Sequence, residues 1–278
     1  MNTIATLLKQ ATIENGGGLS RVDAEYLLSH YLGKPRSWLY AHSDLQLKPE
    51  QLIEIQQLIT RRQQGVPVAY ITGRRGFWSF DLQVTPDTLI PRPETELLVE
   101  LVLAFIHPNS ASRVLDLGTG TGAIALVVAH ERPNAHVLAV DYSEAALAVA
   151  RSNATELKIR NIEFIQSDWF DALAMRRFDV IASNPPYIES NDVHLSQGDL
   201  RFEPKSALAS GSDGLEAIRI IIAGAKNHLN DNAWLLIEHG WNQGEAIRNL
   251  FAQSGFVEIS TEQDLGQRDR VTMGRLVV

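Results

Sequence analysis

The stretch RVLDLGTGTGAIAL, residues 113–126, decides the fold of this chain. A short apolar run leads into a loop of alternating glycines, and a second apolar segment follows the loop. Gly118, Gly120 and Gly122 let the backbone approach a ligand closely, because they carry no side chains. A helix that begins at this loop offers the unpaired N–H groups of its first turn to the same ligand. The stretch therefore predicts a strand, a ligand-binding loop and a helix.

Strand-like and helix-like segments alternate from Arg113 to the end of the sequence. Strands separated by helices of about 10–15 residues predict a mostly parallel, doubly wound sheet with helices on both faces. The predicted fold class is therefore α/β, with a seven-stranded sheet. Strands are expected at 113–117, 136–140, 163–167, 178–183, 233–238, 256–260 and 269–278, and helices near 122–131, 143–157, 214–229 and 243–254.

The part of the sequence before this sheet has a different pattern. Residues 1–66 predict a small bundle of short amphipathic helices, interrupted by ENGGGLS, LGKPRSW and SDLQLKPE, with Ser20 capping the helix near Arg21. Residues 67–93 are expected to form a β-hairpin and a proline-rich linker, in which PVAYITG and FWSFDLQVT are strands and GRRG is the turn. A helix with an apolar stripe follows at the start of the domain at 94–278. The helical stripes are Ile4, Leu7, Leu8 and Ala11; Ala24, Leu27, Leu28 and Tyr31; Leu52, Ile55, Leu58 and Ile59; and Leu97, Leu98, Leu101, Val102 and Phe105.

The composition is that of an ordinary globular protein. The sequence has no cysteine, its eight histidines show no HExxH pairing, and neither a metal site nor a disulfide is expected. No apolar run is long enough to cross a membrane, and the N-terminus has no long apolar region typical of a secretory signal. Residues 1–85 hold nine basic and seven acidic residues, and the rest holds sixteen and twenty-six. This acidic balance argues against a nucleic-acid substrate, and a cytoplasmic enzyme or binding protein is expected.

Acidic residues near the glycine loop indicate which cofactor it binds. Asp141 ends VLAVD roughly 20 residues beyond the loop, the spacing expected of an acid that binds ribose hydroxyls. The loop reads G-T-G-T-G and follows Asp116, whose carboxylate would repel pyrophosphate but suits an ammonium group. S-adenosylmethionine has an ammonium, a sulfonium and a ribose but no phosphate, so it is the expected cofactor. The predicted cofactor-binding residues are Asp116, Gly118, Thr119, Gly120, Thr121, Gly122, Asp141, Asp168, Trp169 and Asn184.

Asp168 and Trp169, in SDWF, are expected to end the third strand. At that position a carboxylate can hydrogen-bond to the edge of an adenine, and an indole ring can cover its apolar face. A core position for Trp169 is the alternative.

A second motif, VIASNPPYIES at residues 180–190, ends another apolar run abruptly. Two adjacent prolines cannot donate backbone hydrogen bonds, so they stop a sheet ladder. The residue before each proline is held extended, which gives a stiff spur with Asn184 on one side and Tyr187 on the other. A strand-ending turn without a chemical role is the alternative.

These motifs, in this order, resemble those of class I S-adenosylmethionine-dependent methyltransferases, which have a Rossmann-like fold. More narrowly, the sequence resembles the protein-glutamine N5-methyltransferases that modify peptide chain release factors. AYITGRRGFWSF, LIPRPETE, RFEPKSAL and LLIEHGWNQG extend the resemblance over nearly the whole sequence. It implies methyl transfer to the side-chain amide nitrogen of the glutamine in the Gly-Gly-Gln motif of class I release factors. It also implies that residues 1–66 recognise the substrate.

The resemblance gives the spur a chemical role. An amide nitrogen is a poor nucleophile, and two acceptors for its hydrogens favour a pyramidal nitrogen as attack begins. The side-chain oxygen of Asn184 and the carbonyl of Pro185 are the expected acceptors, Tyr187 is expected to pack on the amide, and Pro186 completes the substrate-binding set. Neither a covalent intermediate nor a metal is needed, and release of the amide proton to water is expected.

The expected roles are less specific for residues in LIPRPETE, RFEPKSAL and LLIEHGWNQG. Arg92 and Glu94 either border the active site or pair with each other. Glu203 and Pro204, in RFEP, are expected to shape a loop over the substrate entrance. His239 is expected in the core or in a loop, and not as a base.

Three other functions agree with parts of the sequence. The spur motif is shared with enzymes that methylate amino nitrogens of nucleic-acid bases such as adenine, although the acidic balance speaks against them. A glutamine methyltransferase of a large-subunit ribosomal protein would have the same catalytic motifs. In a non-catalytic cofactor-binding module, the spur would be only a turn.

Overall fold

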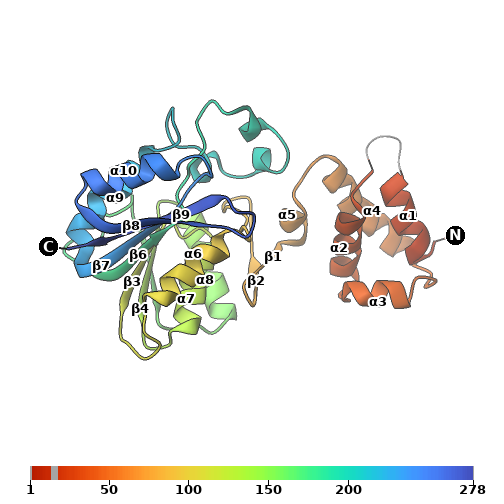
Figure 1. The fold of residues 1–278 in the computed structure, drawn as a ribbon. Coiled ribbons are helices and arrows are strands. Elements are labelled where there is room, and N and C mark those ends of the chain that lie inside the picture. Colours follow the sequence, from red (N-terminus) through yellow and green to blue (C-terminus); the bar gives the residue numbers. More distant parts are fainter. Residues whose placement is uncertain (1, 14–17, 278) are drawn as a thin grey trace. The chain divides into compact units, whose positions relative to one another are not determined.

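The structure is a computed structural model that describes residues 2–13 and 18–277. It divides into two compact units, the first ending at Arg74 and the second beginning at Arg75 (Figure 1). This division falls inside the segment 67–93. Most of the predicted break ENGGGLS lies outside the described residues.

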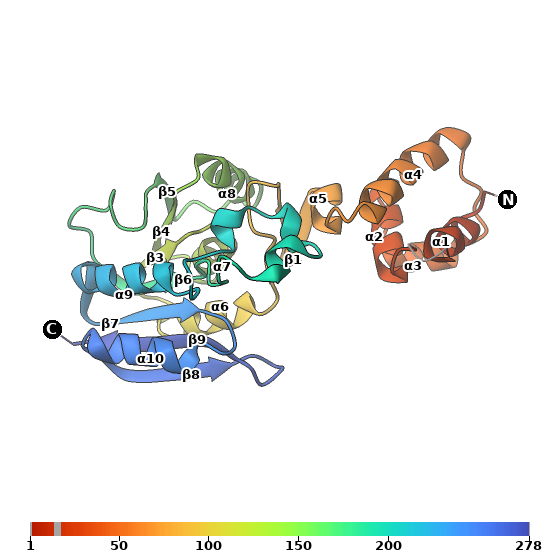
Figure 2. The ribbon, with the colours of Figure 1, turned by 90° about the horizontal axis from the view of Figure 1, so that it is seen from above.

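The first unit is a group of short helices packed around an apolar core (Figures 1 and 2). The predicted cap is confirmed, because the Ser20 hydroxyl accepts the Asp23 N–H at 3.0 Å. One helix was missed, since LGKPRSW was expected to be a break but Pro35 is the N-cap of a helix instead. The helices are α1 (Ile4–Ile13), α2 (Arg21–Leu32), α3 (Arg36–Ala41), α4 (Pro49–Gln63) and α5 (Val68–Thr72), and their buried core includes Ile4, Leu27, Leu28, Leu39, Ile55 and Ile59.

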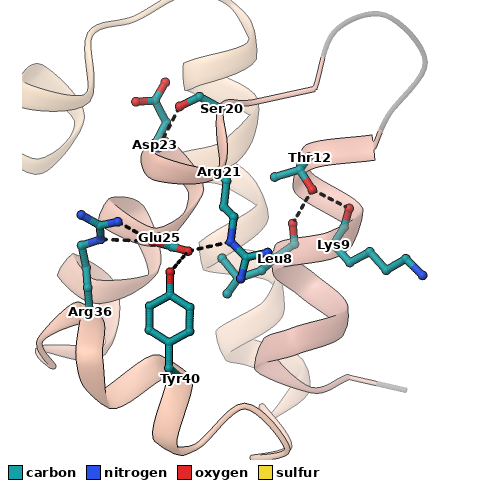
Figure 3. Close-up of polar contacts among 9 residues, drawn as sticks. All are labelled: Leu8, Lys9, Thr12, Ser20, Arg21, Asp23, Glu25, Arg36 and Tyr40. Atoms are coloured by element: carbon teal, nitrogen blue, oxygen red, sulfur yellow. Dashed lines mark hydrogen bonds and ion pairs between the residues drawn. The ribbon is translucent and has the colours of Figure 1, made fainter.

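A buried carboxylate, Glu25, joins α2 to α3 (Figure 3). Its oxygens accept hydrogen bonds from Arg36 at 2.6 Å, Arg21 at 2.9 Å and the Tyr40 hydroxyl at 2.5 Å. Burial raises the pKa of Glu25, but the hydrogen bonds from these three side chains bring it down to about 2. The charged form is therefore an integral part of the first unit at neutral pH.

The segment before the sheet was partly mispredicted. PVAYITG is not a strand but contains the helix α5, because Pro67 caps its start and Gly73, with φ of 70°, ends it. GRRG is not the turn of the hairpin, since most of it lies in the strand β1 (Arg74–Phe77). The turn comes at Trp78, with φ of 56°, before β2 (Phe80–Gln83). Strand-like composition was therefore overridden by the proline and glycine at the two ends of α5.

The second unit is a seven-stranded, mostly parallel sheet with helices on both faces, as predicted (Figures 1 and 2). The strand order is β5-β4-β3-β6-β7-β9-β8, with β9 antiparallel to both of its neighbours. The elements are α6 (Thr95–Ala104), β3 (Arg113–Leu117), α7 (Ala123–Glu131), β4 (His136–Asp141), α8 (Glu144–Glu156), β5 (Ile162–Gln166), β6 (Phe178–Ser183), η1 (Val193–Ser196), η2 (Leu200–Phe202), η3 (Lys205–Ala207), α9 (Glu216–His228), β7 (Leu229–Glu238), α10 (Gly244–Gln253), β8 (Phe256–Gln263) and β9 (Asp269–Leu276).

Two apolar layers hold these helices against the sheet. Val114 of β3 faces a layer that includes α6 and α7, whereas the next residue, Leu115, faces a layer that includes α9 and α10. This alternation follows from the period of two in a strand, and burial on both faces explains the continuous apolar runs in the sequence.

The topology places the carboxyl ends of three strands together. Leu117 of β3 pairs with Val140 of β4 on one side and with Ser183 of β6 on the other. From β3 the chain proceeds to β4 and β5 on one side, and then crosses to β6 on the other side. In such sheets the crevice at this change of direction is the expected ligand site.

Candidate active site

A cavity of about 280 Å³ lies at the carboxyl ends of β3, β4 and β6, within the second unit. Its lining includes the glycine loop and the spur, so the two motifs found in the sequence meet at one site. Further parts of the wall come from Asp87, Thr88, Leu89, Pro91, Arg92, Pro204, Ser206 and Ala207. Of the predicted residues, Gly118, Thr119, Gly120, Thr121, Asp141, Asp168, Trp169, Asn184, Pro185 and Pro186 line the cavity, whereas Asp116, Gly122 and Tyr187 are not lining residues.

Asp141 is the last residue of β4 and braces the glycine loop. Its Oδ2 accepts the Gly120 N–H at 2.8 Å, and its Oδ1 accepts the Ser143 N–H at 2.9 Å. Burial raises the pKa of Asp141, and these backbone hydrogen bonds oppose that rise. Because each carboxylate oxygen has two lone pairs, Asp141 can still accept hydrogen bonds from two ribose hydroxyls.

Asp116 lies behind the glycine loop and is 1% exposed. Its Oδ2 accepts the Thr119 hydroxyl at 2.6 Å, but its buried Oδ1 has no hydrogen-bond partner among the described residues. Burial raises the pKa of Asp116 to about 7, and the hydrogen bond from Thr119 opposes that rise. A cation brought near Asp116 would favour its ionised form.

Asp168 and Trp169 follow β5 but do not end it, because the strand stops at Gln166. Trp169 has a φ of 46°, and this turn directs it to the cavity, where it is a lining residue. Its ring also packs against the apolar layer of α9 and α10, so it belongs to the core as well as to the cavity. A Cβ atom on Gly118 would lie 3.8 Å from this ring, so the loop and the indole are near neighbours.

The spur begins where β6 ends. The Ser183 hydroxyl donates to the Leu117 carbonyl at 2.7 Å and ties the end of β6 to that of β3. Asn184 Nδ2 donates to the Thr95 hydroxyl oxygen at 3.0 Å, so the amide nitrogen of Asn184 is directed at α6. Pro185 is buried and, like Asn184, lines the cavity. The spur thus brings Asn184 and Pro185 to the wall of the cavity.

Two neighbours hold the carbonyl of Tyr187 at the far end of the spur. Gln243 Nε2 donates to this carbonyl at 3.0 Å, and Gln243 Oε1 accepts the Gly240 N–H at 2.8 Å. Gly214 packs so closely that a Cβ atom there would lie 2.3 Å from the same oxygen. The Tyr187 ring packs against the layer of α9 and α10, and its contact with a substrate amide stays a prediction.

Glu203, from RFEP, fastens one wall of the cavity. It is buried, its Oε2 accepts the Ile90 N–H at 3.0 Å, and its Oε1 accepts from Arg92 at 2.5 Å. The ion pair of Arg92 is therefore with Glu203, and Arg92 borders the cavity. Pro204 also lines the cavity, so RFEP shapes the wall of the site.

His239 is a core residue, as expected. It is fully buried, its Nδ1–H donates to the Gly240 carbonyl at 2.9 Å, and its Nε2 accepts the Thr272 hydroxyl at 2.8 Å. Burial lowers the pKa of His239. Both ring nitrogens are used in these structural hydrogen bonds, so His239 has no free atom for proton transfer.

Sequence reasoning missed two residues next to the spur, Thr95 and Glu238. Thr95 is the first residue of α6 and lines the cavity beside Asn184. Glu238 is the last residue of β7 and is 1% exposed. A signal for Glu238 existed, because it is a carboxylate at the end of the apolar run AWLLIE, in the same position as Asp141 after HVLAV.

The residues at the cavity fit S-adenosylmethionine. Asp116 is not a lining residue, but it lies two residues before Gly118 of the glycine loop. Its buried Oδ1 has no hydrogen-bond partner of normal geometry among the described residues, and a carboxylate at this position suits a cationic group bound at the loop. Asp141 offers acceptors for ribose, and Trp169 offers an apolar ring for adenine. Among the described lining residues, Arg92 is the only one with a positively charged side chain, and it is paired with Glu203. The lining therefore suits a cationic cofactor better than a phosphorylated one.

Two further features of the described residues bear on the class of protein. No three His, Asp or Glu side chains in residues 2–13 and 18–277 are arranged to hold a metal ion. Within the same residues, no helix has the length and apolar character needed to span a membrane.

The fold and the site define a methyltransferase. A family model described as a methyltransferase domain matches residues 108–267, and one described as the PrmC N-terminal domain matches residues 2–73. A solved methyltransferase from Pyrococcus furiosus covers 81% of this chain and 99% of its own, with a TM-score of 0.56 and 16% identity, and this likeness concerns the fold.

Relatives define the family more narrowly. The release factor glutamine methyltransferase of Xylella fastidiosa strain Temecula1 is 53% identical over 257 residues, which are 92% of this chain and 94% of the relative. The protein of the same name from Pseudomonas aeruginosa is 52% identical over 275 residues, 99% of each chain. The chain belongs to the release factor glutamine methyltransferase family.

Proposed function

We propose that this chain transfers the methyl group of S-adenosylmethionine to the side-chain amide nitrogen of the glutamine in the Gly-Gly-Gln motif of class I peptide chain release factors. The observation that carries the proposal is a single cavity lined by Asp141 and Trp169 on one side and by Asn184 and Pro185 on the other. Family membership supplies the substrate class. A cytoplasmic location is part of the same proposal.

The cofactor side of the cavity has a binding role in this proposal. Asp141 binds the ribose hydroxyls, Asp168 and Trp169 bind the adenine, and Asp116 compensates the charge of the ammonium group. Gly118, Thr119, Gly120, Thr121 and Gly122 form the loop over the cofactor. When it is bound, S-adenosylmethionine supplies an electrophilic methyl group.

The spur orients the glutamine. Its amide nitrogen becomes nucleophilic only when its lone pair leaves conjugation with the carbonyl, and acceptors for both N–H hydrogens favour that geometry. Asn184 Oδ1 and the Pro185 carbonyl are the acceptors, and the fixed backbone of Pro185 and Pro186 keeps the second one aligned in advance. Tyr187 packs on the amide, and the amide proton leaves to water.

The first unit contributes binding of the protein substrate. Within residues 1–66, α1 to α4 form a bundle that is not part of the sheet, and its core is separate from both apolar layers of the second unit. We assign residues 1–66 to recognition of the release factor, 67–93 to the connection and 94–278 to methyl transfer.

Methyl transfer from labelled S-adenosylmethionine tests this function. The purified protein is incubated with a class I release factor, with the same factor carrying alanine for the motif glutamine, with large-subunit ribosomal proteins and with RNA. Label is expected in the unaltered release factor alone. Equal label in the alanine variant would contradict the site of transfer, and label only in ribosomal protein or RNA would favour the two alternative substrates.

A further inference from the structure

Glu238 and Asn184 are neighbours because of the sheet register. β6 and β7 are parallel, and Ser183 pairs with Ile237, the residues just before Asn184 and Glu238. Both side chains therefore leave the sheet at the same edge, next to the first turn of α6. Glu238 is 1% exposed, so its carboxyl group has little access to water.

Asn184, Thr95 and Glu238 lie together at this end of the sheet. Asn184 Nδ2 donates to Thr95 Oγ1 at 3.0 Å. Thr95 and Asn184 are both close enough to the Glu238 carboxyl to lower its pKa as hydrogen-bond donors do. Because Thr95 Oγ1 accepts from Asn184, its own hydrogen is available for Glu238. The second oxygen, Glu238 Oε2, is buried and has no partner among the described residues. The three residues therefore form a small acceptor-rich network behind the spur.

The network distinguishes the two orientations of the Asn184 amide. An amide has nearly the same shape when its oxygen and nitrogen are exchanged, so packing alone does not select between them. A carboxylate only accepts hydrogen bonds, so it selects the orientation in which Nδ2 faces Thr95 and Glu238. The oxygen then faces the cavity. In the reverse orientation, Nδ2 would meet the N–H groups of a substrate amide and repel them.

We propose that Glu238 is a positioning residue, which acts through Thr95 and directly on Asn184 to keep the Asn184 oxygen directed at the substrate amide. This inference rests on the proposed function for its effect on turnover. It assigns a role to a buried carboxyl group that lies in LLIEHGWNQG but received no role from the sequence.

The protonation state of Glu238 decides whether it can select the orientation of Asn184. Burial raises the pKa of Glu238 to about 7, and the hydrogen bond from Thr95 opposes that rise. Arg270 lowers the pKa, Glu94 raises it, and the hydrogen bond from Asn184 lowers it. The ionised form accepts from Asn184, whereas the neutral acid can donate to the Asn184 oxygen and no longer selects one orientation.

Substitutions that preserve shape test the proposal. Glu238→Gln presents either an oxygen or an N–H₂ to Asn184, so kcat is expected to fall about tenfold while KM and cofactor affinity stay within about twofold. Thr95→Val is expected to give a similar loss, and Thr95→Ser, which keeps the hydroxyl, to restore most of kcat. Glu163→Gln, at an exposed position of β5, is the matched control and is expected to leave kcat unchanged.

A double-mutant cycle separates positioning from independent effects. In an Asn184→Ala background, Glu238→Gln and Thr95→Val are expected to cause no further loss, because the group that they orient is absent. Full additivity, or unchanged kcat in both single variants, would overturn the proposal. If Glu238→Gln does not fold, the kcat values of Thr95→Val and Thr95→Ser test the proposal in its place.

An NMR measurement separates this inference from the proposed function. The side-chain N–H₂ hydrogens of Asn184 are expected to exchange slowly with solvent in the unaltered protein and at least tenfold faster in Glu238→Gln. Equal exchange in the two proteins would contradict the positioning role whatever the substrate is. Slow exchange without methylation of the release factor would contradict the proposed function and leave the positioning role standing.

Discussion

Asn184 has no unusual reactivity of its own, and its role depends on where neighbouring residues hold it. Ser183 fixes the end of β6 to β3, and Pro185 restricts the backbone just after Asn184. An acceptor that is already aligned does not have to reorganise when charge develops on the substrate nitrogen. The catalytic contribution of Asn184 is thus mainly one of alignment.

Asn184→Ala tests that contribution. We expect kcat to fall about 100-fold, comparable to loss of one positioned hydrogen bond in a transition state. Cofactor affinity, measured by titration calorimetry, should change little, because Asp141 and the glycine loop are intact. Near-normal turnover would mean that the spur is only a structural turn.

Whereas Asn184→Ala should lower turnover, Asp141→Ala should weaken binding of the cofactor. Loss of hydrogen bonds to a charged acceptor is expected to weaken S-adenosylmethionine binding by about 1.5–3 kcal/mol, measured by the same titration. Part of this loss will come from the loop, since Gly120 also bonds to Asp141. The thermal unfolding curve is the control for folding. Unchanged affinity in a folded variant would exclude Asp141 from the ribose site.

The raised pKa of Asp116 predicts that the affinity for the cofactor depends on pH. Its pKa is raised by burial to about 7, so the free protein carries a neutral Asp116 below that pH and a charged one above it. A cationic cofactor favours the charged form, so affinity is expected to rise between pH 6 and pH 8. Asp116→Asn should flatten this rise in titrations across that range. The same slope in both proteins would assign it to another group.

At the scale of elements, the site is built from strand ends. Its carboxylates and the spur were predictable, because each follows an apolar run at the same edge of a parallel sheet. The helix α5 was not predictable, because its sequence VAYIT has a strand-like composition. Only Pro67 and Gly73, at its two ends, determine that it is a helix. The place of Glu238 at a strand end could also be read from the sequence, but its nearness to Asn184 could not. That nearness depends on the pairing of β6 with β7, which no local pattern specifies.

Gly214 connects the segment before α9 to the spur, and a matched pair of substitutions tests this contact. Gly214 and Gly198 both have positive φ, of 72° and 53°, but only at Gly214 would a Cβ atom collide, at 2.3 Å from the Tyr187 carbonyl. Both alanine variants should lose about 1–2 kcal/mol of unfolding free energy from backbone strain, and Gly214→Ala should lose more because of the collision. Only Gly214→Ala should also lose kcat, by about tenfold or more. Equal kcat values in the two variants would show that the spur tolerates displacement.

At the scale of the whole molecule, chemistry and recognition are assigned to different units. The first unit has its own core and its own buried ion network at Glu25, so it does not need the sheet for its apolar burial. A glutamine can reach the cavity only from an exposed loop, and the glycines of a Gly-Gly-Gln loop let its backbone come close to the spur. Contacts remote from that loop can then add binding energy only for an intact protein substrate.

Removal of residues 1–73 tests this division of labour. With an intact release factor, kcat/KM is expected to fall about 100-fold, which corresponds to about 2.7 kcal/mol, the contribution of one or two strong interface residues. With a short peptide that carries only the Gly-Gly-Gln loop, it should change less than threefold, because the peptide makes no contact outside the cavity. The truncated protein must first show a cooperative unfolding transition and unaltered affinity for S-adenosylmethionine. Equal losses on the two substrates would contradict a recognition role for the first unit, since a general defect of the cavity would affect both alike.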